Sequence, residues 1–222
     1  MELLVATLVY TSSGRDGDVL ARMRFIYETV RNAPGLITSH LYRGGGKESL
    51  YFILTTWDEE ESWRKAQDKH GLKRLLLESS EMLSATPQQW LMHYIWGYSR
   101  PAALPVVAAV HLASARADQV EFVQQGYIKG LRQQAIQPML AFALLARGMN
   151  EESYPISRQG RMLEERYIAG ASSRQPNSIF LSLFSWASEE DREDFYADSR
   201  YRTVDSFMNS HCAVHALPLE PI

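Results

Sequence analysis

The chain contains the same order of elements twice. Its segments LYFILTTW and IFLSLFSW are apolar strands that each end in a tryptophan, Trp57 and Trp186, and each leads into an acidic segment that starts a helix. The two tryptophans lie 129 positions apart, and around each one the pattern predicts strand, helix, strand, strand, helix, strand. Because two copies of a half-barrel can close into one barrel, the sequence predicts a pseudo-dimer within a single chain.

Hydrophobic periodicity places the two repeats along the chain. The predicted strands are 3–10, 36–43, 50–57 and 89–98 in the first copy, and 106–112, 139–146, 179–186 and 212–217 in the second. Two prolines within RPAALP, residues 100–105, disfavour both helix and central strand, so this segment is the expected junction. The sequence therefore predicts repeat 1 over residues 1–100 and repeat 2 over 105–222, with an insertion at about 147–178 that we expect to form a lid.

Composition restricts the classes of partner. The chain has 23 basic and 26 acidic residues, a net charge of −3, and no block of lysine or arginine that would bind nucleic acid or an anionic membrane. Its apolar runs are shorter than the roughly 18 residues of a membrane span. A single cysteine, Cys212, fits a reducing compartment. We therefore expect a folded cytoplasmic protein whose partner is a small molecule.

Alternation along the third strand of each repeat predicts two aromatic faces. Tyr51, Ile53, Thr55 and Trp57 share one face in repeat 1, and Phe180, Ser182, Phe184 and Trp186 share the matching face in repeat 2. Such a face either packs as core or binds an electron-rich aromatic molecule, and the residues alone leave both interpretations open.

A metal site is not expected. His211 and His215 in HCAVH resemble metal ligands, but on a strand their backbones would lie about 13 Å apart. One zinc ion, with nitrogen ligands at about 2 Å, would not bind both side chains. Gly44 to Gly46 join two strands and are interpreted as a hairpin turn.

The segment APGLITSHLYR, the following strand that ends in Trp-Asp, and the helix that opens EEESW resemble the antibiotic biosynthesis monooxygenase domain of the dimeric α/β-barrel superfamily. Repeat 1 resembles this family over most of its length, and repeat 2 does so mainly in element order. The resemblance implies an α+β fold in which two tandem ferredoxin-like repeats form an intramolecular dimeric α/β-barrel. The sheets are antiparallel, the helices lie outside, and a pocket lies between sheet and helices in each unit.

The same resemblance implies an oxidoreductase of the monooxygenase type that acts on a phenolic, anthrone-like or quinol molecule. Trp57 and Trp186 match a residue of the substrate pocket. Trp63 and Arg192 stand where anthrone oxygenases of the family carry tyrosine, Ser182 stands where they carry asparagine, and Tyr42 where they carry histidine. The expected substrate-binding residues are Trp57, Trp63, Tyr51, Trp186, Ser182, Arg192 and Tyr196.

An oxygenase that works without a cofactor must deprotonate its substrate and stabilise the anion. His70 at a helix break, and His40 and Tyr42 on one face of a strand, are the expected catalytic residues; in repeat 2, Tyr196 and Tyr201 lie on the equivalent helix. No cofactor is required on this reading, and reduced flavin stays open. Haem is disfavoured, because Ala66 and Leu76 occupy the positions where haem-degrading relatives carry Trp and His.

Three other functions stay open on the same barrel. A non-catalytic or sensory small-molecule binder needs the same apolar cavity, and so does a non-oxidative isomerase or cyclase. A haem-binding or haem-degrading protein is the third. A further homodimer of the chain is also left open.

Overall fold

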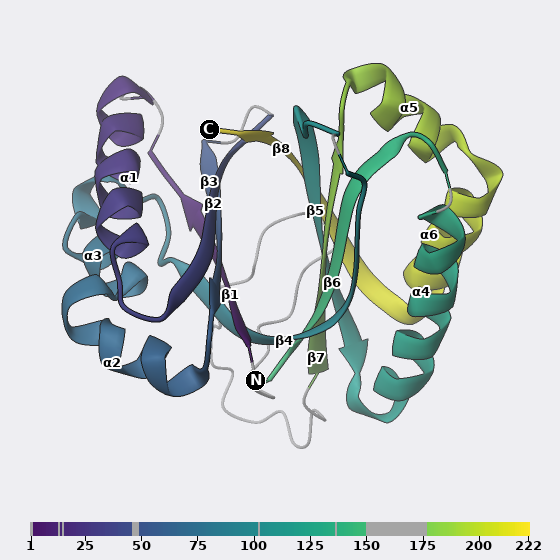
Figure 1. Ribbon diagram of the computed structural model, residues 1–222, viewed down its shortest axis with the longest axis horizontal. Helices are drawn as coiled ribbons and strands as arrows, with labels where there is room; N and C mark the ends of the chain where they lie inside the picture. The colour runs from purple at the N-terminus through teal and green to yellow at the C-terminus, as the bar shows by residue number, and fades with distance from the viewer. Residues whose placement is uncertain are drawn as a thin grey trace, which may run out of the picture. The chain divides into compact units, whose positions relative to one another are not determined.

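The computed structural model describes residues 2–12, 14, 16–45, 49–101, 103–135, 137–149 and 177–222 (Figure 1). Residues 150–176 of the expected insertion, and with them the expected lid, lie outside the described residues.

The elements follow the duplicated order. The first copy contains β1 (Leu3–Tyr10), α1 (Asp16–Arg31), β2 (Leu36–Gly44), β3 (Leu50–Trp57), α2 (Glu60–His70), α3 (Leu72–Leu77) and β4 (Gln88–Ser99). The second contains β5 (Val107–Arg116), α4 (Val120–Gln134), β6 (Leu140–Gly148), β7 (Asn177–Trp186), α5 (Glu189–Ala197), α6 (Ser199–His211) and β8 (Cys212–Pro221). The hydrogen-bonded strand order, β1-β3-β2-β8-β5-β7-β6-β4, is that of a closed barrel. The expected α+β class with two ferredoxin-like repeats is confirmed.

Contacts divide the chain into two compact units. The first unit is Met1–Tyr94 with Pro218–Ile222, and the second unit is Ile95–Leu217. The fourth strand of each copy, β4 or β8, therefore begins in one unit and ends in the other. The expected junction of the repeats at residues 100–105 stays a prediction.

In the first unit, β1 pairs antiparallel with both β3 and β4, and β2 pairs with the other edge of β3. Helices α1, α2 and α3 lie against one face of this sheet (Figure 1). Helix α1 buries one stripe at helical spacing, Val19, Met23, Ile26 and Val30, as its sequence pattern predicts. The Tyr27 hydroxyl donates to the carbonyl oxygen of Ser39 on β2 at 2.8 Å, which fixes α1 to the sheet.

In the second unit, β7 is the central strand and pairs antiparallel with β5 and β6. Trp186 lies opposite Val107 of β5, just as Trp57 lies opposite Leu3 of β1 in the first unit. The two copies thus have the same strand register, and positions in one can be compared with positions in the other. Helices α4, α5 and α6 cover one face of this sheet (Figure 1).

Among the residues described, none of the helices has the length and apolar character needed to cross a membrane.

Candidate functional site

A buried polar cluster lies between strand β5 and helices α5 and α6 of the second unit. His111 of β5 is only 6% exposed. Its Nε2 lies 2.9 Å from the Tyr196 hydroxyl, and its Nδ1 lies 3.4 Å from the Tyr201 hydroxyl. Because one nitrogen of a neutral imidazole donates and the other accepts, two hydroxyls that can do either suit both ring nitrogens. We call His111, Tyr196 and Tyr201 the His–Tyr cluster.

The local sequence explains how the two tyrosines meet the histidine. Helix α5 ends at Ala197, and the Asp198 carboxylate caps α6 by accepting from the Arg200 amide at 2.7 Å. This change of helix direction brings the rings of Tyr196 and Tyr201, five positions apart in the chain, to a centroid distance of 5.0 Å. The helix break therefore builds one wall of the cluster.

Aromatic rings surround the cluster. His111 lies parallel to Tyr196, with ring planes 8° apart, and meets Phe184 edge-on at 5.2 Å. Phe184, Trp186 and Phe195 are fully buried beside them. Next along the sheet, Ser182 lies opposite His111 in the strand register, and its hydroxyl donates to Tyr127 of α4 at 2.6 Å. The layer between sheet and helices is therefore apolar with a few polar groups at fixed positions.

Burial keeps the cluster uncharged at neutral pH. Burial, together with a smaller effect of the charge of His215, lowers the pKa of His111 to about 4. Burial also raises the pKa of Tyr196 and of Tyr201 well above the ordinary tyrosine value. His111 is thus a neutral imidazole at pH 7, able to accept a proton.

The cluster borders a small cavity. His111, Tyr127, Tyr201 and Asp205 are its polar walls, and Ala113, Val204, Met208 and Val214 are the apolar ones. Its free volume is about 10 Å³ for the centre of a water molecule. That is about the space one water needs, so an aromatic molecule fits only if a side chain moves.

The predicted residues of the second repeat lie together. Trp186 and Ser182 are buried, and Tyr196 belongs to the cluster. Arg192 lies one turn before Tyr196 on α5, and its guanidinium lies 2.5 Å from the Glu189 carboxylate. His111 and Tyr127 were not among the site residues predicted from the sequence. The available signal was a lone titratable residue in the apolar strand VAAVHLASA.

The predicted residues of the first repeat are divided between the two faces of the sheet. Trp57 and Tyr51 share one face of β3, and the Trp57 indole nitrogen donates to the Thr55 hydroxyl at 3.0 Å. His40 and Tyr42 lie opposite Leu54 and Phe52, on the other face. Their rings are 6.3 Å apart, so these two do lie near each other. Burial raises the pKa of Tyr42 to about 12.

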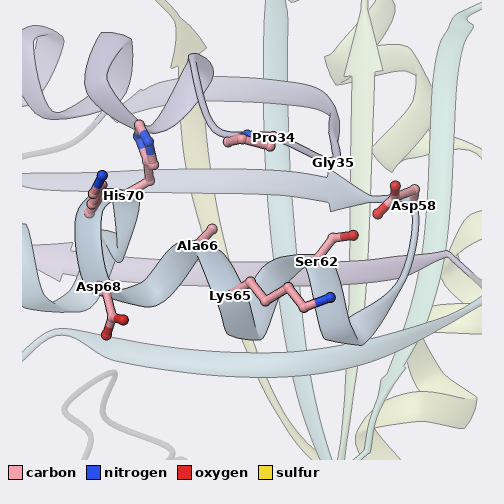
Figure 2. Close-up of a pocket in the computed structure, with 9 residues that line it drawn as sticks. Pro34, Gly35, Asp58, Ser62, Lys65, Ala66, Asp68 and His70 are labelled. Carbon is pink, nitrogen blue, oxygen red and sulfur yellow. The ribbon is translucent and has the colours of Figure 1, made fainter.

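His70 lies in a different place again. It ends α2, and its Nδ1 donates to the Thr29 carbonyl oxygen at 2.8 Å. It lines an open groove of about 390 Å³ that also includes Gly35, Asp58, Ser62 and Lys65. Figure 2 shows Asp58 and Ser62 toward one end of this groove and His70 at the other. Trp63, half-buried on the same helix, is not among the lining residues of the groove, and neither is Trp57.

The first unit does not repeat the His–Tyr cluster. When the two units are compared by strand register and by position on the following helix, Thr7 occupies the position of His111. Ile53 likewise occupies the position of Ser182, and Gln67 that of Tyr196. Thr55 stands for Phe184, so Trp57 has a hydroxyl partner, whereas the buried Trp186 indole nitrogen has no partner among the described residues. Two copies of one fold thus carry different polar groups at matching positions.

The N-terminal part of the chain is similar in sequence to a known family. Residues 3–75 match the family model described as antibiotic biosynthesis monooxygenase. The antibiotic biosynthesis monooxygenase match lies within the first unit, whereas the His–Tyr cluster lies in the second.

Solved structures are similar over nearly the whole chain. An anthrone oxidase-like protein has a TM-score of 0.72 at 13% identity, over 100% of this chain and 91% of that one. A candidate monooxygenase from Fusobacterium nucleatum subsp. nucleatum has a TM-score of 0.70 at 4% identity, over 99% and 92%. Another from Lactobacillus acidophilus has 0.65 at 6% identity, over 99% and 93%. These identities support the shared fold alone. No curated protein sequence matches the chain.

Proposed function

We propose that the second unit is a monooxygenase site that oxygenates an electron-rich aromatic molecule of the phenol, anthrone or hydroquinone type. The observation that carries the proposal is His111, neutral and hydrogen-bonded to Tyr196 within a layer of buried aromatic rings. The antibiotic biosynthesis monooxygenase family of residues 3–75 supports the same class of reaction by analogy.

The chemistry needs a base and a way to hold an anion. In the proposed reaction His111 accepts a proton from the substrate, and the Tyr196 or Tyr201 hydroxyl donates to the resulting oxyanion. The carbanion form of the substrate reduces molecular oxygen and combines with it to give a peroxide. Loss of water from the peroxide leaves a carbonyl, so that anthrone and one O₂ give anthraquinone and one H₂O.

The low pKa of His111 determines which substrates suit it. Before a substrate binds, the His111 imidazole has a pKa of about 4 and is therefore a weak base toward a phenol. The substrate anion that forms beside it favours the imidazolium by charge attraction, so proton transfer and anion formation are coupled. The cluster offers no fixed positive charge, so we propose a substrate that arrives neutral.

Electrons come from the substrate anion itself, so the proposal requires no cofactor. Reduced flavin is retained as a second arm of the test, because it would supply electrons to a substrate that does not form a stable carbanion. The proposed partner is a small aromatic molecule.

Access to the cluster requires a movement. The cavity beside His111 has room for about one water molecule, whereas the Tyr196 ring is half-buried and lies at the outer side of the cluster. We propose that Tyr196 swings outward to admit the substrate ring to the face of His111.

The test is oxygen uptake by the metal-free protein with an anthrone and with a naphthohydroquinone, each with and without reduced flavin. We expect His111→Gln to lower the enzyme-dependent rate by about 100-fold or more, and Tyr196→Phe to lower it by about tenfold. Tyr94→Phe is the matched control, because Tyr94 is 53% exposed on β4, and it should leave the rate unchanged. An equal rate in wild type and His111→Gln would refute the assignment.

A non-catalytic small-molecule binder is the second candidate. The observation in its favour is the open groove of about 390 Å³ beside His70, which is large enough for a small ligand. Quenching of tryptophan fluorescence by the same aromatic compounds, with no oxygen uptake above the spontaneous rate, would favour this function over the oxygenase.

A further inference from the structure

The small cavity beside His111 is walled by polar groups from three elements. The polar residues that line it are His111 on β5, Tyr127 on α4, and Tyr201 and Asp205 on α6. Its free volume is about 10 Å³ for the centre of a water molecule. A buried water needs about that volume and two to four polar partners, and this cavity provides both.

Asp205 lies on the solvent side of this arrangement. It follows Tyr201 by one helical turn, so both residues lie on the same face of α6, and Asp205 is half-buried where Tyr201 is buried. Asp205 lines the cavity together with Tyr127 and Tyr201, and its charge contributes to raising the pKa of Tyr127, Tyr196 and Tyr201.

Among the residues that the structure describes, other charged and titratable groups also act on the cluster. His215 of β8 acts on His111, Cys212 of β8 acts on Tyr127, and Arg192 of α5 acts on Tyr196. In the part of the chain that the structure describes, no lysine or arginine forms an ion pair with Asp205. Its carboxylate is therefore not held in a salt bridge there.

We propose that Asp205 and one water molecule bound in this cavity form a proton path between His111 and solvent. The use of this path in turnover rests on the proposed function, in which His111 takes the substrate proton, but the path itself is a property of the folded protein. It makes Asp205 a positioning residue, because it acts through the water and not on the substrate.

The transfer conserves charge and atoms at each step. An imidazolium Nδ1–H gives its proton to the Tyr201 hydroxyl or to the water, which releases its own proton onward in the same movement. The Asp205 carboxylate accepts the proton and then passes it to bulk solvent. Since burial raises the pKa of Tyr201 well above the ordinary tyrosine value, the phenol relays the proton without remaining ionised. The Asp205 carboxylate is half-buried, so it can hold the proton and reach water.

The path is tested without turnover. In protein labelled with ¹⁵N-histidine, the exchange of the His111 ring N–H with solvent is measured by NMR. We expect Asp205→Asn, which keeps the side-chain shape, to slow this exchange by about tenfold or more, and Asp205→Glu to restore most of it. Asp194→Asn, an exposed carboxylate on α5, is the matched control and should change nothing.

Two further measurements show whether a change in exchange rate reflects the proton path. Thermal unfolding of each variant verifies that the fold is intact, and a high-resolution crystal structure should contain a water within hydrogen-bond distance of Asp205 and of Tyr201 or Tyr127. An unchanged exchange rate in a folded Asp205→Asn protein, or a cavity without that water, overturns the proposal.

Failure of the path and failure of the oxygenase give different results. If the protein consumes oxygen, Asp205→Asn should lower kcat by about tenfold in weak buffer, and added imidazole should restore it, because a small base replaces the carboxylate. If Asp205→Asn slows the exchange but the protein consumes no oxygen, the proton path is supported and the oxygenase is rejected. If Asp205→Asn leaves both oxygen uptake and exchange unchanged, the oxygenase is supported and the proton path is rejected.

Discussion

The fold holds His111 in its neutral form. Burial lowers the pKa of this imidazole from an ordinary value of 6.5 to about 4, whereas in the unfolded chain it returns to the ordinary value. The unfolded state therefore binds more protons than the folded state between pH 6.5 and 4. By linkage, the free energy of unfolding falls as the pH is lowered through this window and is unaffected by this group above it.

We therefore predict an acid-dependent loss of stability from this one side chain. Between pH 7.5 and 4.5, His111 should lower the free energy of unfolding by about 2–3 kcal/mol. Urea unfolding of wild type and His111→Gln at both pH values isolates this contribution, since the carboxylates are common to the two proteins. Equal losses in the two proteins would contradict the assigned pKa.

At the scale of elements, the cluster depends on how closely α4 and α6 pack. Gly126 and Gly130 lie one turn apart on α4, and a Cβ at either position would collide with Phe207 or Val204 of α6. Because these two glycines have no side chain, α4 and α6 can pack close together. Tyr127 on α4 and Asp205 on α6 reach one cavity for that reason.

Gly130→Ala should consequently separate the two helices. We predict a loss of about 1–3 kcal/mol in the free energy of unfolding, because Val204 is β-branched and cannot move its methyl groups away easily. Gly17→Ala on α1, where an added Cβ meets nothing within 4 Å, should be neutral or stabilising. The urea concentrations at the unfolding midpoint of the two variants and of wild type measure both changes in stability. A Gly130→Ala protein as stable as wild type would show that the helices have room to spare.

The elements themselves could be predicted from sequence, whereas the faces of β2 could not. Alternation and helical spacing located the strands well; β3 was expected at 50–57 and is found there. The pairing of β2 with β3, however, shifts by one residue between Leu36 and Thr38. That bulge moves His40 and Tyr42 to the face opposite Trp57, and it results from the pairing of two strands, not from either sequence alone.

The His–Tyr cluster could be predicted only in part. Tyr196 and Tyr201 were both expected on the helix of repeat 2 that follows Trp186. His111 was not expected, because a single histidine in an apolar strand is more often a satisfied structural residue. His111 joins the cluster only because β5 packs against the break between α5 and α6. This contact brings His111 to Tyr196 and Tyr201, which lie 85 and 90 positions later in the chain.

At the scale of the whole molecule, the two units are unequal copies. The second unit carries a histidine, three tyrosines and a serine in contact across sheet and helices, whereas the first carries Thr7, Ile53 and Gln67 at the positions of His111, Ser182 and Tyr196. Thr7 accepts a hydrogen bond from Gln89 at 3.0 Å and is a structural residue.

Substitutions at matching positions should separate the roles of the units. We predict that Thr7→Val leaves oxygen uptake within about twofold of wild type, whereas His111→Gln lowers it by about 100-fold or more. Rates with the anthrone substrate, normalised to folded protein, provide the comparison. Similar losses in both variants would mean that each unit supplies part of the activity.

The His–Tyr cluster lies outside the residues that match the family model, and this separation bears on how such a chain can change over generations. Selection for folding acts on both halves, whereas selection on the reaction proposed for the His–Tyr cluster would act on the second half only. The first half can then keep the sequence that matches the family model while its buried polar positions change to residues that pack well. In a duplicated chain of this kind, family signature and chemistry need not reside in the same copy.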